Sequence, residues 1–277
     1  MPPVTHPASV EIIVPARNEA SRLPGGLRAL CEKAATLPLR TSILVVDSAS
    51  TDSTADVVRA WPPGPVPVGL LRCERPGKGA AVREGLLATR APFVGFCDAD
   101  MATELSALDV AISLLAAGHP LVIGSRALSA SVVEARSSAL RAAGAALFRS
   151  MARWTLPGAT DTQCGFKFFA GPLARAAALS LRTVGFAFDV ELLASCLQGG
   201  TTLTEIPVNW QDIAGSTFSV RRHSAAAFRD LASIWLQSRI LHRGSAAPPM
   251  PPMPPALASR PHLLPEWQLP AAGAAKT

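Results

Sequence analysis

The chain has 277 residues, of which 49% are hydrophobic and 17% charged, so it can bury a large core and wholesale disorder is excluded. Its net charge of +6 comes mainly from arginine, which favours contact with phosphates or anionic lipids. A genome that favours arginine codons would produce the same excess of arginine. The five cysteines are widely spaced and contain no Cys-x-x-Cys pair, which argues against a disulfide framework or a structural zinc site and favours a reducing cytoplasm.

The N-terminus has no secretion signal, and no apolar run approaches the roughly 20 residues that span a bilayer. We therefore expect a cytoplasmic protein that meets a membrane only as a peripheral protein, on the inner face. Residues 1–8 are expected to form a flexible lead, and the Pro/Ala-rich residues 244–277 a disordered tail. Residues 9–243 then form one domain.

The first half of the domain alternates between apolar runs and helical patterns. The apolar runs predict strands at 10–15, 43–46, 68–72, 93–97 and 121–123, with helices between them. Strict alternation implies an α/β fold with a mainly parallel sheet flanked by helices. In such a sheet the strand ends that bind ligands lie along one edge.

The second half is less regular. It predicts helices at 134–154, 188–198 and 225–243, a polar loop at 161–167 that enters a short strand, and a strand at 203–210.

Two surfaces of these helices have the composition of a membrane contact. The first helix carries an arginine stripe of Arg141, Arg149 and Arg153, and the last carries Phe228, Leu231 and Trp235 on one face. Either could lie on an anionic membrane. The alternative for the last helix is packing against the core.

Two carboxylates, Asp98 and Asp100, directly follow the fourth predicted strand. With one residue between them they can reach the same point beyond the strand end, where they repel each other unless a cation lies between them. Mg²⁺ and Mn²⁺ prefer such oxygen ligands and often arrive with phosphates. The pattern therefore predicts a metal–diphosphate site, with a solvated turn or a helix cap as the alternative.

Several other phosphate and hydrolase sites are excluded by missing motifs. The turn Gly77-Lys78-Gly79 lacks the first glycine and the hydroxyl residue of a P-loop, and Val82 occupies the third glycine position of a dinucleotide fingerprint. There is no Gly-x-Ser-x-Gly elbow and no His-Glu-x-x-His. A carboxylate pair, a lysine in a glycine turn and polar strand ends remain, and this set suits a nucleoside diphosphate held with a metal.

Eight short motifs then occur in an order that resembles one family. They are Val-Pro-Ala-Arg-Asn-Glu (14–19), Val-Val-Asp (45–47) with Ser-Thr-Asp (50–52), Gly-Lys-Gly-Ala-Ala-Val-Arg (77–83), Asp-Ala-Asp (98–100), Gly-Ser-Arg (124–126), Asp-Thr-Gln-Cys-Gly-Phe-Lys (161–167), Phe-Asp-Val-Glu-Leu-Leu (188–193) and Glu-Ile-Pro-Val-Asn-Trp (205–210). Over residues 9–243 the chain resembles family 2 glycosyltransferases of the GT-A fold, in particular the dolichyl-phosphate β-glucosyltransferase branch.

The resemblance implies a binding site for a nucleotide-sugar donor. The implied contacts are Pro15, Arg17, Glu19, Asp47, Lys78, Asp98, Ala99 and Asp100, with Asp98 and Asp100 as ligands of Mg²⁺ or Mn²⁺. Relatives often have Asp-Gly where this chain has Ser48-Ala49, which leaves the identity of the base open.

The resemblance also implies an acceptor site. Arg126 and a second arginine, Arg136 with Arg141 as the alternative, would hold the acceptor phosphate, unless they are ordinary surface arginines. Asp189 occupies the position of a general base, if one is used, and Asp161 is the competing carboxylate, whose loop could instead be a structural Asx turn.

The expected function is inverting transfer of a hexose, first of all glucose from UDP-glucose, to polyprenyl phosphate. The rivals are use of GDP-mannose, transfer to a soluble hydroxyl acceptor, and sugar-phosphate nucleotidyl transfer, whose glycine-rich signature after the first strand is missing. No nucleic-acid partner is expected, and the oligomeric state stays open.

Overall fold

A computed structural model describes residues 9–134, 139–198, 200–213 and 229–236. The predicted lead at 1–8 and the predicted tail at 244–277 lie outside the described residues. None of the described helices is long and apolar enough to cross a lipid bilayer.

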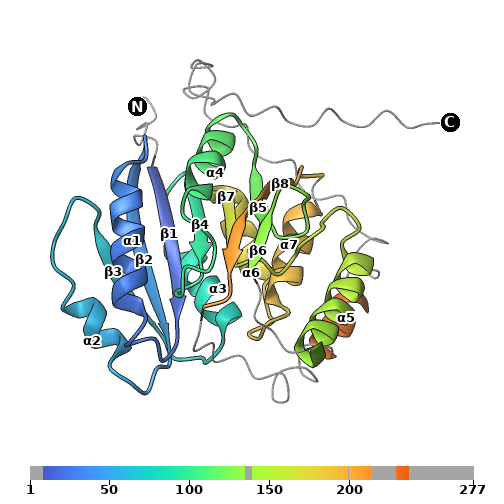
Figure 1. Cartoon of the computed structure of the whole chain (residues 1–277), viewed down its shortest axis with the longest axis horizontal. Coiled ribbons are helices and arrows are strands. Elements are labelled where there is room, and N and C mark those ends of the chain that lie inside the picture. The colour runs from blue at the N-terminus through green and yellow to red at the C-terminus, as the bar shows by residue number, and fades with distance from the viewer. Residues whose placement is uncertain (1–8, 135–138, 199, 214–228, 237–277) are drawn as a thin grey trace.

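A seven-stranded sheet with the order β3-β2-β1-β4-β7-β5-β8 forms the centre of the molecule (Figure 1). Its strands are β1 (Ser9–Ala16), β2 (Arg40–Ser48), β3 (Val68–Cys73), β4 (Phe93–Cys97), β5 (Leu121–Ser125), β7 (Phe166–Ala170) and β8 (Thr204–Pro207). The helices are α1 (Leu23–Ala35), α2 (Thr54–Arg59), α3 (Lys78–Ala88), α4 (Ala107–Ala116), α5 (Ala139–Thr155), α6 (Gly171–Ser180) and α7 (Phe188–Leu197). The predicted alternation of strands and helices from β1 to β5 is confirmed.

The sheet is buried on both faces because its strands contribute apolar side chains to two cores. In β1, Ile12 and Val14 pack with α1 and α4 on one face, whereas Ile13 packs with α3, α6 and α7 on the other. This alternation follows from the two-residue period of a strand. Continuous apolar runs are what a doubly covered sheet requires.

The sheet is not parallel throughout, because β7 runs antiparallel between β4 and β5. Gly95 of β4 lies opposite Phe168 of β7, and a Cβ at Gly95 would overlap the Phe168 ring. The sequence predicted the strand, but its place in the sheet depends on contacts between segments about 70 residues apart.

Three expectations for the second half need correction. The predicted strand at 203–210 is two strands, β8 and β9 (Asn209–Gln211), and β9 pairs with β6 (Val132–Glu134) in a separate two-stranded sheet. The helix predicted from 134 starts at Ala139, since Glu134 still belongs to β6. Helix α6 was not predicted, although its Pro at the first turn is a helix-start signal.

The last predicted helix is described only at 229–236, which is helical. There Leu231 and Ile234 are buried in the core with α6 and α7, as the core-packing alternative requires. Of the other two residues of the predicted face, Trp235 is 36% exposed, and Phe228 lies outside the described residues.

Candidate active site

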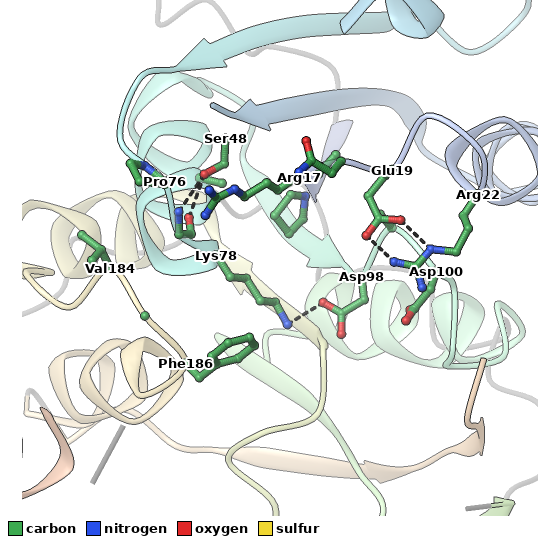
Figure 2. A pocket seen from close by; sticks show the side chains of 17 residues that line it. Arg17, Glu19, Arg22, Ser48, Pro76, Lys78, Asp98, Asp100, Val184 and Phe186 are labelled. Carbon is green, nitrogen blue, oxygen red and sulfur yellow. Dashed lines mark hydrogen bonds and ion pairs between the residues drawn. The ribbon is translucent and has the colours of Figure 1, made fainter. Parts of the chain in front are cut away.

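A cavity of about 500 Å³ lies where β1, β2 and β4 end. β1 pairs with β2 along its full length, up to the pair of Ala16 and Asp47, while Ile13 pairs with Phe96 of β4. The turn that starts α3 and the segment before α7 complete the walls. The lining residues are Pro15, Ala16, Arg17, Asn18, Glu19, Arg22, Ser48, Pro76, Gly77, Lys78, Ala81, Asp98, Ala99, Asp100, Val184, Gly185 and Phe186 (Figure 2).

Lys78, Asp98 and Asp100 come together in this cavity. The Lys78 ammonium lies 2.5 Å from Oδ1 of Asp98, and Figure 2 shows its side chain reaching across the cavity to that carboxylate. Burial raises the pKa of Asp100, and the neighbouring charge of Asp98 raises it further. Burial opposes the charge on Lys78, but Asp98 and Asp189 outweigh it and hold its pKa above the ordinary lysine value.

A glycine makes room for the Asp98 carboxylate. Asp98 N donates a hydrogen bond to the carbonyl oxygen of Gly165 (3.1 Å), so the two backbones run in contact. A Cβ at position 165 would overlap the Asp98 carboxylate itself. Gly165 therefore fixes where this carboxylate can lie.

The turn after β1 carries Glu19 and Arg22. Glu19 is buried, and its two carboxylate oxygens accept hydrogen bonds from Nε and Nη2 of Arg22 at 2.8 and 2.5 Å. Nη1 of Arg22 is buried without a hydrogen-bond partner, although the residue lines the cavity. The sequence reasoning missed Arg22, which its three-residue spacing from Glu19 could have indicated.

Asp47 was expected in the cavity but does not line it. Its side chain is fully buried, Oδ1 accepts a hydrogen bond from Ser50 N (3.2 Å), and Oδ2 lies 3.1 Å from Nε of Arg72 without forming a hydrogen bond. The next residue, Ser48, does line the cavity. Its hydroxyl accepts a hydrogen bond from Gly77 N (2.9 Å) and so ties β2 to the turn that carries Lys78.

The wall formed by Val184, Gly185 and Phe186 was not predicted. Gly79 N donates to the carbonyl oxygen of Val184 (2.9 Å), and side chains at Gly77 or Gly79 would collide with this segment. Glu191 holds the segment from behind, since its carboxylate accepts hydrogen bonds from the backbone N–H groups of residues 182 and 183. No local pattern indicates this wall, because it forms when α7 packs beside α3.

Asp189, the first candidate for a base, is not among the residues that line the cavity. It is 3% exposed, and Oδ1 accepts a hydrogen bond from Nζ of the fully buried Lys167 at 2.5 Å. Burial raises the pKa of the Asp189 carboxyl, and the charges of Lys167 and Lys78 offset part of that effect. The sequence reasoning had not singled out Lys167.

Asp161, the competing carboxylate, forms an ion pair with Arg126. Its oxygens accept hydrogen bonds from Nε and Nη2 of Arg126 at 2.7 and 3.0 Å and from the backbone N–H groups of Arg126 and Gln163. Burial works against the charged carboxyl, but Arg126 outweighs it and holds the pKa of Asp161 below its ordinary value. The Arg126 guanidinium also lies 5.4 Å from the ring centre of Trp210.

A second hollow, of about 510 Å³, lies between α5 and the residues next to Arg126 and Asp161. It is lined by Ala127, Ala146, Arg149, Ser150, Arg153, Trp154 and Thr160. Arg149 and Arg153 are exposed, and Trp154 is 80% exposed. Arg136 lies outside the described residues, and so does the side chain of Arg141.

The cavity has the donor set that a hard divalent cation needs. The charge of Asp98 contributes to the raised pKa of Asp100, and Lys78 forms an ion pair with Asp98. Within the described ranges no group of three or more His, Cys, Asp or Glu side chains could hold an ion on its own. Two carboxylates fit an ion that completes its coordination with phosphate oxygens and water, as Mg²⁺ commonly does.

Comparisons with known proteins identify the family. Residues 11–170 match the model of glycosyl transferase family 2. The chain is 35% identical to the dolichyl-phosphate beta-glucosyltransferase of Drosophila melanogaster over 243 residues, which cover 82% of this chain and 74% of that protein. The human protein of the same name is 33% identical over 75% of this chain and 68% of its own length.

Solved structures resemble the fold. Glucosyl-3-phosphoglycerate synthase from Mycobacterium tuberculosis, crystallised with UDP, superposes with a TM-score of 0.62 at 19% identity, covering 82% of this chain and 80% of that one. The same enzyme with Mn²⁺, UDP-glucose and phosphoglyceric acid gives 0.61 at 17% identity with the same coverage. This chain therefore belongs to glycosyltransferase family 2, with the GT-A fold, and groups with the dolichyl-phosphate β-glucosyltransferases.

Proposed function

We propose that this glycosyltransferase moves glucose from UDP-glucose to a polyprenyl phosphate with inversion at the anomeric carbon. The observation that carries the proposal is the convergence of Lys78, Asp98 and Asp100 in one cavity large enough for a nucleotide sugar. The choice of glucose and of a lipid phosphate is supported by the names of the relatives.

On the donor side, Asp98 and Asp100 would hold Mg²⁺ or Mn²⁺ together with the diphosphate. The ion would act as a Lewis acid that offsets negative charge on the departing UDP. Lys78 approaches the same phosphates as a point charge. Arg17, which is exposed at the rim of the cavity, and Arg22, with its unpartnered Nη1, are the other cations available to them.

Pro15, Ala99 and Ser48 shape the part of the cavity that would receive the nucleoside. Asp47 supports this part from behind, because its buried carboxylate holds the backbone of Ser50. We propose that Asp47 acts on the nucleoside by positioning this loop, which leads from β2 to α2.

On the acceptor side, Arg126 is the residue proposed to receive the phosphate. Asp161 fixes its guanidinium with two parallel hydrogen bonds, and the Trp210 ring lies beside it. A second arginine, Arg136, remains part of this proposal. Asp161 therefore acts by positioning Arg126, in place of the base role that was its alternative.

A phosphate acceptor removes the need for a general base, because one of its oxygens already carries a negative charge near neutral pH. In a single displacement that oxygen forms the bond to the anomeric carbon, and the bond to the UDP oxygen breaks with its electron pair going to UDP. Asp189 and Asp161 are both buried against cations, which suits a reaction in which neither takes a proton.

A membrane-bound acceptor also has to be reached. We propose that the protein lies peripherally on the inner face of the cell membrane through α5. Arg149, Arg153 and the exposed Leu147 and Trp154 give this helix a basic and apolar surface, which opens beside Arg126.

The direct test is incubation with radiolabelled UDP-glucose or GDP-mannose, Mn²⁺ or Mg²⁺, and a polyprenyl phosphate, followed by organic extraction. We expect label in the organic phase from UDP-glucose. Label from GDP-mannose alone would replace the proposed sugar, and label transferred only to a soluble acceptor such as 3-phosphoglycerate would replace the lipid acceptor. An Asp100→Asn variant that transfers at the wild-type rate would exclude the metal role.

A further inference from the structure

A buried ion pair lies beside the aromatic ring that Lys78 also approaches from the donor cavity. Lys167 in β7 is fully buried, and its Nζ donates to Oδ1 of Asp189 (2.5 Å) and to the carbonyl oxygen of Cys164 (2.6 Å). Removing two charges from water costs free energy, and two well-packed apolar side chains at these positions would often stabilise the fold at least as much. The pair therefore calls for an explanation beyond stability.

The pair is linked to the cavity through Phe96. The Nζ atoms of Lys167 and Lys78 lie 5.3 and 6.0 Å from the centre of this ring, and Lys78 also lies 5.9 Å from the ring of Phe188, the residue before Asp189. Both lysines are thus in the range of a cation–π contact with one aromatic cluster. The charge of Asp189 attracts both of them.

Lys78 is thus attracted by carboxylates with different roles. Asp98 and Asp100 line the cavity and are proposed metal ligands, whereas Asp189 does not line it. A cation that takes oxygens of Asp98 would compete with Lys78 for that carboxylate. Asp189 would then be the counter-ion that remains for Lys78.

Lys167 limits how strongly Asp189 can hold Lys78. It forms an ion pair with Oδ1 of Asp189, so this buried carboxylate is already neutralised. Without Lys167, an uncompensated Asp189 would draw the Lys78 ammonium toward itself and away from the phosphates. Without Asp189, the carboxylates left to attract Lys78 would be Asp98 and Asp100, both proposed metal ligands.

We propose that Lys167 and Asp189 are positioning residues that hold the Lys78 ammonium in reach of the donor diphosphate. The proposal rests on the proposed function only for the identity of the donor. It assigns Asp189 a role on the donor side rather than as an acceptor base.

The test compares Lys167→Met, Asp189→Asn and the double variant K167M/D189N. Each single variant leaves one buried charge unpaired and should melt several degrees lower, whereas the double variant should recover much of the loss. The double variant should nevertheless bind UDP with Mn²⁺ about tenfold more weakly and show a raised KM for UDP-glucose, with KM for the acceptor unchanged.

The control is K33M/D109N, which removes a more exposed lysine–aspartate pair of the same 2.5 Å length between α1 and α4, neither residue of which lines the cavity. It should leave UDP affinity unchanged. If K167M/D189N does not fold, Asp189→Glu keeps the charge and moves the carboxylate by one methylene, and it should also weaken UDP binding.

Wild-type UDP affinity and KM in a folded K167M/D189N or D189E variant would overturn the proposal. So would an Asp189→Asn variant with unchanged UDP affinity and a kcat lowered by about 1,000-fold or more, which is the signature of a lost base. Because UDP binding is measured separately from transfer, a wild-type protein that transfers no sugar would refute the proposed function and leave this test intact.

Discussion

At the scale of single residues, Gly165 decides whether the Asp98 carboxylate can occupy its place in the proposed metal site. A methyl group at this position would overlap the Asp98 carboxylate, so Gly165→Ala must displace it. We expect the concentration of Mn²⁺ needed for half-maximal activity to rise about 10- to 100-fold, the usual cost of disturbing the support of a metal ligand. A Mn²⁺ titration of sugar transfer measures this.

Gly158→Ala is the matched control for that variant. It lies in the loop that leads to Asp161, and a Cβ there meets nothing within 4 Å. The control should keep the wild-type Mn²⁺ dependence. If Gly165→Ala kept it as well, the carboxylate of Asp98 would not be a ligand.

Ala49, in the loop between β2 and α2, has a backbone conformation that lowers the stability of the fold. It has a φ of 51°, in the left-handed region that disfavours residues with a Cβ. Glycine has no Cβ and adopts this conformation without that cost, so Ala49→Gly should raise the free energy of unfolding by about 1 kcal/mol. Urea unfolding measures this change, and Ala29→Gly on the exposed face of α1 should lower stability by about 0.5 to 1 kcal/mol. Equal losses in both variants would contradict the argument.

The residues that were predictable are those whose neighbours in sequence define their surroundings. Asp98 and Asp100 follow a buried strand, and Lys78 starts a helix in a glycine turn, so their position at the edge of the sheet was implied. The placement of Asp47 behind the cavity and the pairing of Lys167 with Asp189 were not. Both depend on how separate elements pack, which sequence periodicity does not describe.

At the scale of elements, the first half of the chain, in which strands and helices alternate, was predictable, and the second half was not. An apolar run followed by a helical pattern specifies a βαβ unit almost by itself, as from β1 to β5. The strand β7 comes back antiparallel, and the run at 203–210 divides between two sheets. A short alternating run is compatible with either outcome, because only the strands beside it determine the pairing.

Helix α5 carries the prediction that belongs to this scale. Replacing Arg149 and Arg153 by glutamine removes two exposed charges from α5, beside the second hollow. At about 1 kcal/mol for each charge near an anionic surface, binding to vesicles containing phosphatidylserine should weaken by roughly 30-fold. Vesicle co-sedimentation measures this binding.

The control for α5 is R28Q/R40Q, which removes the same charge from exposed positions on α1 and β2. It should leave vesicle binding close to that of the wild type, and both double variants should bind UDP with unchanged affinity. Equal loss of vesicle binding in the two double variants would mean that total charge, rather than α5, drives the attachment.

At the scale of the whole molecule, the sheet separates two cores, and the candidate active site lies between them at the ends of β1, β2 and β4. Residues of both cores therefore stand behind the cavity: Leu23 of α1 packs on one face of the sheet and Phe188 of α7 on the other. A ligand that bridges the ends of β1, β4 and α3 contacts elements that pack on both faces. Donor binding should thus stabilise the whole fold rather than one part of it.

The cysteines give a measurement of this coupling. All five are free, Cys31 is partly exposed, and Cys73, Cys97, Cys164 and Cys196 are buried. Burial raises the pKa of Cys196 to about 12, so its thiol hardly reacts in the native state.

With iodoacetamide we expect fast labelling of Cys31 and slow labelling of the other four. Mn²⁺ and UDP at about 100 times Kd add about 2.7 kcal/mol to native stability and should slow those four about 100-fold, with Cys31 as the internal control. Slowing of Cys97 and Cys164 without Cys196 would show instead that the donor stabilises only its own neighbourhood.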